Sequence, residues 1–404
     1  MDTQRLHPTA WTALLLTGLY AAAAALCSIF VSVYFWINSH DFGIVCSHYL
    51  ALFTVTPFTF VLAGWYSQAR ERLHVYRLGL VLHAVYYGTL LLLRERAPAY
   101  AAELGALQGV TWGIYWAGAN TFNFDVTREG KREFYFGLLQ AVNGVFRLLG
   151  PLIGGFIIAV SPGTLQGFHS LFAISLGLYA LSFAVSFKMP PDREPRPFRL
   201  RRALLPGRDQ RDWRLIMLAS FTLAGNQSVF AFLPGLLMYM ETGDELSVGA
   251  YASLQALVGI VVALVLGRMV VPRNRAKSMR LGAWLLLVAG VVLSIKLSVA
   301  TLIVFGMLRA VAAPMFGIPH VSLRLDTIAK SAEDPAQRIE YICAWEVPMA
   351  LGRIAMMLIL MGMYAWLRES GLGLRLAVLI LCSTRLLTYA LLRQTTALRR
   401  GAGL

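Results

Sequence analysis

The chain has 404 residues, of which 57% are hydrophobic and only 14% carry an Asp, Glu, Lys or Arg side chain. A soluble domain contains roughly a quarter charged residues, so one aqueous core could not bury this much apolar surface. The composition therefore excludes a soluble globular protein and indicates lipid as the solvent. Since a membrane-spanning helix needs about 20 apolar residues, the chain has room for about twelve spans.

The net charge of +15 indicates topology rather than nucleic-acid binding. Most Lys and Arg residues fall in loops that we place in the cytoplasm, where basic residues are enriched in membrane proteins. We therefore expect both termini in the cytoplasm and the protein in a bacterial-type cytoplasmic (inner) membrane. The expected partners are membrane lipids and a small-molecule solute, without nucleic acid, and the chain is expected to be a monomer.

Apolar segments follow one another along the whole chain. The predicted spans are 10–37, 43–66, 77–93, 99–124, 134–160, 168–187, 214–238, 248–270, 280–296, 301–323, 340–364 and 374–393. Span seven is interrupted by the polar run Gly225–Ser228 and by Pro234, and span ten carries Arg309, Pro314 and Pro319. Broken or polar helices are tolerated in a membrane where they line a cavity, so both spans are expected to line one.

A basic segment rich in proline, from Lys188 to Arg214, separates spans six and seven. Such a segment can lie along anionic lipid headgroups or serve only as a solvated linker. We therefore predict an all-α polytopic membrane protein with twelve transmembrane helices in two pseudo-symmetric six-helix bundles. The predicted parts are an N-terminal bundle (1–187), a basic cytoplasmic linker (188–213) and a C-terminal bundle (214–404).

The two halves share an internal repeat about 200 residues long, which indicates two homologous units. In the first repeated window the matched pairs are Arg132 and Arg338, Tyr135 and Tyr341, Gln140 and Glu346, and Arg147 and Arg353. In the second, the run Gly64, Arg70, Arg72, Arg77 and Gly79 has the spacing of Gly267, Arg273, Arg275, Arg280 and Gly282. In the third, Gly105-x-Leu107-x-x-Val110 matches Gly306-x-Leu308-x-x-Val311, and the matched runs end in Asp125 and Asp326.

Six spans, a basic linker and six related spans resemble the plan of the major facilitator superfamily. Gly150-Pro151-x-x-Gly154-Gly155 is similar to the GPxxGG motif of that family, and Asp125, Arg132 and Gly137 resemble its loop between spans four and five. The two arginine loops occupy the place of the family's signature loop. That loop usually carries an Asp four residues after its Gly, where this chain has Gln68 and Val271.

The resemblance implies that spans one, four, seven and ten line a central cavity. It also implies conformational or gating roles for Gly64, Arg70, Arg72, Gly267, Arg273, Arg275, Asp125, Arg132, Gly150, Pro151, Gly154 and Gly155. Small residues let helices approach closely, and Pro151 permits bending, so the GPxxGG motif is expected to serve packing and rocking rather than ligand contact.

Several polar side chains are candidate ligands of a solute. Gln108, Trp112 and Tyr115 share one face of span four by helical spacing, and Asn120 follows near its inner end. Such a face either contacts the solute or joins helices by hydrogen bonds. Asn226 and Gln227, at the predicted break in span seven, are further candidates.

Arg309 is the internal equivalent of Gln108 and lies among apolar neighbours in span ten. A central arginine costs about 3 kcal/mol on insertion scales, so something must compensate it. The compensating group is either the anion of a solute or a structural partner, and snorkelling of the side chain to the outer interface is a third solution.

Gln140 and Arg147 share one face of span five, and Glu346 and Arg353 share one face of span eleven. Arg147 and Arg353 are therefore candidate anion ligands, with Gln140 beside the first. Glu346 is the only acid that we place clearly inside the hydrocarbon region, where a carboxyl group can act as a proton carrier. The alternative is a static ion pair of Glu346 with Arg147, Arg309 or Arg353.

These features predict a secondary transporter in which two bundles rock about a midplane site. Arginines outnumber acids inside the spans, which favours a small organic anion, and proton coupling as a symporter or antiporter is compatible with Glu346. No P-loop, GxSxG, HExxH or GxGxxG motif is present, so we expect no enzyme, cofactor or metal. The alternatives are a flippase for a lipid or lipid-linked phosphate headgroup and a membrane sensor without transport.

Overall fold

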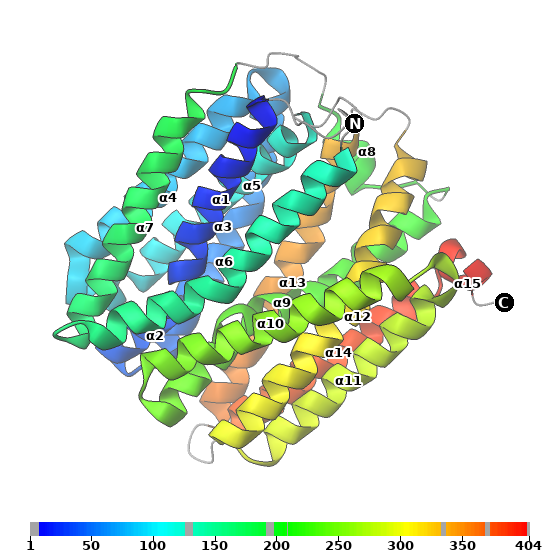
Figure 1. Cartoon of the computed structure of the whole chain (residues 1–404). Coiled ribbons are helices and arrows are strands. Elements are labelled where there is room, and N and C mark those ends of the chain that lie inside the picture. Colours follow the sequence, from blue (N-terminus) through cyan, green and yellow to red (C-terminus); the bar gives the residue numbers. More distant parts are fainter. Residues whose placement is uncertain are drawn as a thin grey trace. The chain divides into compact units, whose positions relative to one another are not determined.

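The protein is almost entirely helical (Figure 1). The computed structural model describes residues 8–125, 132–190, 198–207, 209–332, 337–367 and 372–401. Among these residues there is no β-strand, which confirms the predicted all-α class. The helices are α1 (Pro8–Cys27), α2 (Phe30–Ser39), α3 (Phe42–Ala69), α4 (Arg72–Leu93), α5 (Ala101–Asp125), α6 (Arg132–Val160), α7 (Thr164–Ser186), α8 (Leu200–Leu204), α9 (Arg211–Thr242), α10 (Glu245–Met269), α11 (Arg275–Ile295), α12 (Val299–Ser331), α13 (Arg338–Trp366), α14 (Leu372–Leu392) and α15 (Thr396–Gly401), with 3-10 turns η1 (Arg94–Tyr100) and η2 (Pro272–Asn274).

Within the described residues, 11 segments are long and apolar enough to cross a membrane. One of them, Arg72–Asn120, contains both α4 and most of α5 with the turn η1 between them. The number of segments is therefore compatible with the twelve predicted spans. All four cysteines are buried and free.

The chain forms two compact units. The first comprises Met1–Phe198 together with Asp244–Ser253, and the second comprises Arg199–Gly243 and Leu254–Leu404. Part of the segment predicted to be a solvated linker is folded onto the second unit, because the backbone N–H of Arg199 donates to Glu340 Oε1 at 2.6 Å. The boundaries given above for the two bundles and the linker stay a prediction.

Aspartates satisfy the free backbone N–H groups at the start of two long helices. Asp41 Oδ1 accepts from the N–H of Gly43 at 2.7 Å at the start of α3. At the start of α10, Asp244 accepts from the Ser247 hydroxyl at 2.5 Å and from the Ser247 N–H at 2.8 Å. The hydrogen bond from the Ser247 hydroxyl, with two backbone N–H bonds, lowers the pKa of Asp244. Such caps contribute about 1 kcal/mol each to helix stability.

Glycines allow close helix packing in the first unit. On α5, a Cβ atom at Gly109 would lie only 2.7 Å from the carbonyl oxygen of Leu52 on α3. On α6, Gly150 and Gly154 face α1, where a Cβ atom at Gly154 would lie 2.7 Å from the carbonyl oxygen of Leu26. These two glycines of the GPxxGG motif therefore let the backbones of α1 and α6 approach closely.

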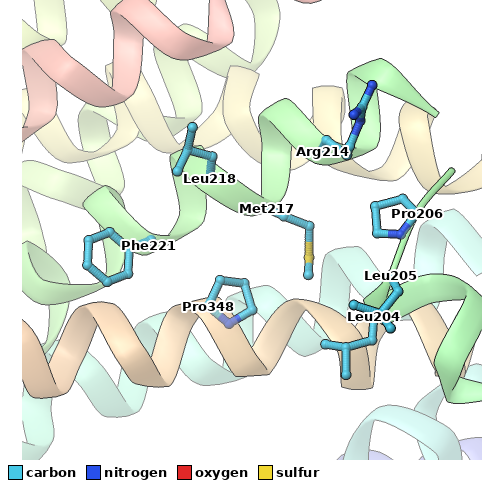
Figure 2. Close-up of a pocket in the computed structure, with 8 residues that line it drawn as sticks. All are labelled: Leu204, Leu205, Pro206, Arg214, Met217, Leu218, Phe221 and Pro348. Carbon is cyan, nitrogen blue, oxygen red and sulfur yellow. The ribbon is translucent and has the colours of Figure 1, made fainter. Parts of the chain in front are cut away.

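In the second unit, a hollow of about 490 Å³ lies between α9 and α13 (Figure 2). Leu204 and Leu205 lie at one end of it, Leu218 and Phe221 line it from α9, and Pro348 lines it from α13.

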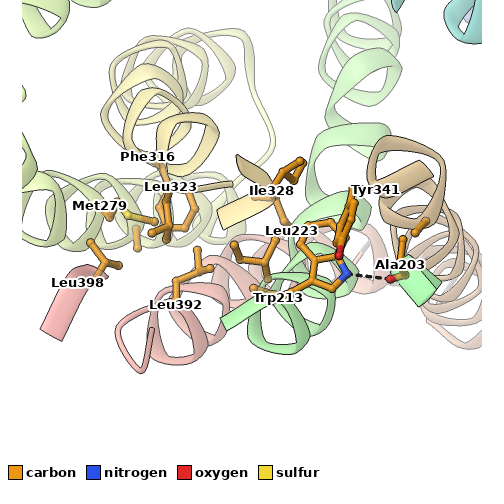
Figure 3. Close-up of a cluster of buried hydrophobic side chains, with 14 residues drawn as sticks. Ala203, Trp213, Leu223, Met279, Phe316, Leu323, Ile328, Tyr341, Leu392 and Leu398 are labelled. Atoms are coloured by element: carbon orange, nitrogen blue, oxygen red, sulfur yellow. Dashed lines mark hydrogen bonds between the residues drawn. The ribbon is translucent and has the colours of Figure 1, made fainter. Parts of the chain in front are cut away.

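A core cluster of the second unit is formed by residues of α9, α11, α12, α13 and α14, together with Ala203 of α8 and Leu398 of α15 (Figure 3). Trp213 is fully buried, its ring centroid lies 5.0 Å from that of Tyr341, and its Nε1–H donates to the Ala203 carbonyl at 2.8 Å. The Tyr341 hydroxyl donates to the Ser331 carbonyl at 2.8 Å. Because Trp213 and Tyr341 place their polar atoms on backbone carbonyls, both rings can be buried without an unpaired donor.

The predicted interruption of span seven is wrong. Helix α9 is continuous through Gly225–Ser228 and Pro234. Ser228 Oγ donates to the carbonyls of Ala224 and Gly225, at 3.0 and 3.1 Å, so its hydroxyl is satisfied within the helix. Helix α12 is likewise continuous through both of its prolines. The chain leaves helical structure instead inside the first predicted span, between α1 and α2.

We expect Gly109→Ala to destabilise the purified protein by about 1–3 kcal/mol, because the added methyl group overpacks the contact of α5 with α3. Gly177→Ala on α7 is the matched control, since a Cβ atom there meets nothing within 4 Å. It should leave stability unchanged or raise it slightly, because alanine favours a helix over glycine. Thermal unfolding in detergent measures both variants, and equal midpoints would contradict the packing described for α3 and α5.

Candidate solute-binding residues

Helix α6 carries two exposed faces of different chemistry. Gln140 and Arg147 are exposed and lie seven residues apart, on the same face. Leu149 and Phe156 are 44% and 57% exposed, and at about 100° per residue they lie on the opposite side of the helix. One face therefore suits lipid and the other suits water.

Arg147 lies near the middle of α6, fifteen residues after Arg132 in a helix of 29 residues. In the part of the chain that the structure describes, no hydrogen bond or ion pair engages its guanidinium. An arginine at this depth costs about 3 kcal/mol if it faces lipid. The exposed polar face of α6 therefore stays a predicted solute-binding face.

In the second unit, the repeat counterparts form an ion pair. Arg353 donates to the carboxylate of Glu346, seven residues earlier on the same face of α13. The side chains are 17% and 8% exposed. Of the three partners considered for Glu346, the structure pairs it with Arg353.

The two halves differ in the residue seven positions before this arginine. The first unit has an amide, Gln140, where the second has the carboxylate Glu346. Arg353 is neutralised by its own helix, whereas α6 supplies no acid for Arg147. The repeat therefore has the same cation in both halves but a carboxylate beside it in only one.

Arg309 on α12 has structural partners within the second unit. Its guanidinium donates to Gln255 Oε1 on α10 at 2.8 Å and to the Phe230 carbonyl on α9 at 3.0 Å. The guanidinium carbon Cζ of Arg309 also lies 5.6 Å from the centroid of the Phe230 ring. Sequence reasoning missed Gln255, although it lies at nearly the repeat offset from His48.

His48 and Gln108 form the matching contact of the first unit. His48 Nε2 and Gln108 Oε1 lie 2.8 Å apart, and His48 Nδ1 lies 3.1 Å from the Ala101 carbonyl. Both side chains are buried. Each half thus joins its second and fourth predicted spans through one polar pair, which explains Gln108 by helix packing.

The predicted face of span four does not form one surface. Tyr115 is buried, and its ring stacks on that of Tyr20 with centroids 3.6 Å apart and planes 9° apart. Trp112 is half-buried, and Asn120 is exposed. The structure therefore leaves Trp112 and Asn120 as the members of this set with accessible side chains.

Asn226 and Gln227 are neighbours with opposite surroundings. Asn226 is buried on α9, where its Nδ2 donates to the Leu381 carbonyl at 2.9 Å and its Oδ1 accepts from Arg385 at 2.7 Å. Asn226 thus compensates the buried Arg385 of α14. Gln227 is exposed near the middle of α9 and stays a predicted ligand.

A further arginine lies beside the Glu346 pair. The guanidinium carbon of Arg324 on α12 lies 3.8 Å from the centroid of the Trp345 ring. Trp345 Nε1–H donates to Ser220 Oγ on α9 at 2.6 Å, which fixes the indole plane that the cation covers. The predicted span ten ends at residue 323, so sequence reasoning left Arg324 just outside it, and the aromatic residue directly before Glu346 was the signal available for this contact.

The arginines of the two repeated windows Gly64–Gly79 and Gly267–Gly282 differ in their surroundings. Arg275 donates to Asp326 at 2.8 Å, so the second and third repeated windows meet in the second unit. Arg70 and Arg273 are exposed, and Arg72 is buried. The side chains of the predicted gating residues Asp125 and Arg132 lie outside the described residues. Because the aspartate of the Arg275 pair is 51% exposed, that pair contributes little, about 0–1 kcal/mol.

The remaining predicted gating residues are glycines and Pro151. Gly64 is buried, whereas a Cβ atom at Gly267 would meet nothing within 4 Å. A Cβ atom at Gly155 would lie 2.6 Å from the Glu245 carbonyl oxygen, and Pro151 faces Gly249 of the same unit. Close packing, and not ligand contact, is what the structure assigns to the end of this motif.

The long apolar helices are those of a polytopic membrane protein. The sequence profile of the Major Facilitator Superfamily matches residues 9–323, and the chain belongs to this family. It is similar to the uncharacterized protein YqgE of Bacillus subtilis (strain 168), with 30% identity over 363 residues that cover 90% of this chain and 84% of that protein.

Solved structures share the fold at low sequence identity. The nucleoside transporter NupG has a TM-score of 0.73 and 11% identity, over 95% of this chain and 98% of that one. A POT family transporter in complex with 5-aminolevulinic acid has a TM-score of 0.72 and 10% identity, over 94% and 95%. The human organic anion transporter MFSD10 has a TM-score of 0.66 and 17% identity, over 96% and 100%.

We expect Asn226→Leu to destabilise the protein by about 1.5–3 kcal/mol, the range for a hydrogen bond to a charged group, because buried Arg385 loses its acceptor. In Asn226→Leu/Arg385→Met the two losses should not add, since the contact is already gone. Gln227→Leu changes the adjacent exposed amide and should leave the unfolding midpoint near that of the unchanged protein. Strict additivity in thermal unfolding would show that Asn226 is not the partner that compensates Arg385.

Proposed function

We propose that this protein is a secondary transporter of small organic anions, driven by protons. The observation that supports the proposal is the exposed Arg147 at the middle of α6. We expect Arg147 to face water between walls of low dielectric constant. A fixed cation in such a place raises the local concentration of anions and binds them. The planar guanidinium forms paired hydrogen bonds to a carboxylate or phosphate.

Other accessible side chains of the two units suit an organic anion. Gln140 adds an amide on the same face of α6, and Gln227 of the second unit and Trp112 of the first are accessible polar and aromatic side chains. The name of one structural neighbour, an organic anion transporter, agrees with this solute class.

Glu346 is the group that would bind the coupling proton. While Glu346 is ionised it holds Arg353, and protonation of the carboxylate releases the guanidinium for another anion. Binding of a proton at Glu346 and of an anion at Arg353 would therefore favour each other, as linkage requires. Alternating access of the two halves would then carry anion and proton in the same direction, as a symporter.

We expect Arg147→Gln to lower the uptake of a transported anion into proteoliposomes at least about tenfold, since a charge-assisted hydrogen bond contributes about 1.5–3 kcal/mol. The transported anion is found first with a panel of carboxylates and phosphates. Arg268→Gln, an exposed arginine in the last turn of α10, is the matched control and should retain uptake. Normal uptake by Arg147→Gln would remove the basis of the proposed anion site.

We expect Glu346→Gln to retain exchange of labelled for unlabelled anion but to lose accumulation driven by a pH gradient, because the amide carries no exchangeable charge. Glu103→Gln, at an exposed position in the first turn of α5, should keep both. If Glu346→Gln still accumulates the anion in response to the gradient, the coupling role is wrong. Flipping of labelled phospholipid without uptake of any soluble anion would favour the flippase alternative.

A further inference from the structure

The hollow between α9 and α13 has a chemical gradient along its length. Arg214, Leu218 and Phe221 follow one another at helical spacing on one face of α9 and all line the hollow. Arg214 lies in the first turn of α9 and Phe221 lies about 10 Å further along the axis. The wall therefore changes from charged to apolar within two turns, starting where the membrane-spanning segment starts.

The opposite wall is apolar. Pro348 lines the hollow from α13, and Leu204 and Leu205 approach it from the end of α8 (Figure 2). Leu205 is 68% exposed and Leu218 is 52% exposed, so apolar surface remains open at this position. The volume of about 490 Å³ lies within the range of small-ligand sites, about 300–1,000 Å³.

One basic residue, Arg214, lines the hollow. The guanidinium of Arg214 is directed away from Pro348 (Figure 2), so its aliphatic stem lines the wall while its charge lies outside, as in snorkelling side chains. Arg201 and Arg202 on α8 and Arg211 on α9 are also exposed. The nearby Asp212 is engaged, because its carboxylate accepts from Thr396 of α15 at 3.0 and 2.5 Å.

We infer that this hollow binds one anionic phospholipid, with an acyl chain against Leu218, Phe221 and Pro348 and the phosphate at Arg214. Charge complementarity selects this occupant: Arg214, in the first turn of a candidate membrane-spanning helix, matches an anionic headgroup, and the apolar wall beyond it matches a hydrocarbon chain. The inference does not depend on the anion transport proposed above. It assigns lipid recognition to Arg214, the last residue of the basic segment Lys188–Arg214.

The lipid would bridge two helices of the second unit. It contacts α9 and α13, the helices that carry Gln227 and the Glu346 pair. Occupancy therefore stabilises the packing of α9 on α13 and makes the stability of the unit depend on the lipid composition.

The test is thermal unfolding of the full chain in detergent during titration with phosphatidylglycerol or with phosphatidylcholine of the same acyl chains. We expect phosphatidylglycerol to raise the midpoint by about 3 °C or more at saturation, and phosphatidylcholine to raise it much less. Native mass spectrometry should show one retained phosphatidylglycerol. Inorganic phosphate alone should give no shift, which separates a lipid from a free anion.

Two variants locate the effect. Arg214→Gln should reduce the phosphatidylglycerol shift to that of phosphatidylcholine, and Leu218→Trp, which fills the hollow, should remove the shift. Arg280→Gln, at an exposed position on α11, removes the same charge elsewhere and should leave it intact. Since Arg214 is exposed, its replacement keeps the test valid even if Leu218→Trp does not fold. An equal shift in Arg214→Gln and the unchanged protein, or equal shifts with both lipids, would overturn the inference.

Discussion

A guanidinium inside a bilayer must be compensated, and most of this structure can be understood from how five arginines meet that requirement. Arg385 uses a buried amide, Arg309 an amide and a backbone carbonyl, Arg324 the face of an indole ring, and Arg353 a carboxylate. Each of these partners belongs to the second unit. Arg147, near the middle of α6, is exposed, and we propose that water and a solute take the place of a protein partner there.

Duplication explains why these solutions come in matched positions. In each half the second and fourth predicted spans are joined by a polar pair, His48 with Gln108 and Gln255 with Arg309. The same positions thus hold a neutral contact in one half and a cationic one in the other. At the second pair of positions, Arg353 has an acid seven residues before it and Arg147 has the amide of Gln140. In the proposed mechanism, only the half with Glu346 would respond to a proton.

Much of the fold follows from sequence, whereas the partners of individual side chains do not. Apolar runs and the repeat predicted an all-helical membrane protein with related halves. Helical spacing correctly placed Glu346 and Arg353 on one face. It could not show that α3 and its His48 cover Gln108, since that contact joins residues 60 positions apart. The prediction of a break in span seven was wrong for the same reason. The hydrogen-bond partners of Asn226 lie 155 and 159 positions away along the chain. The fold therefore satisfies a polar run that the local sequence leaves without partners.

The central claim is that the polar face of α6 borders water at the depth of the membrane. The most direct measurement is the rate at which a membrane-impermeant thiol reagent modifies single cysteines in sealed vesicles of either orientation. The native cysteines are buried and give little background. The account predicts that cysteines at positions 140 and 147 react at least about tenfold faster than cysteines at 145 and 149, because deprotonation to the reactive thiolate needs water. Position 147 reacting as slowly as 149 in both orientations would contradict it.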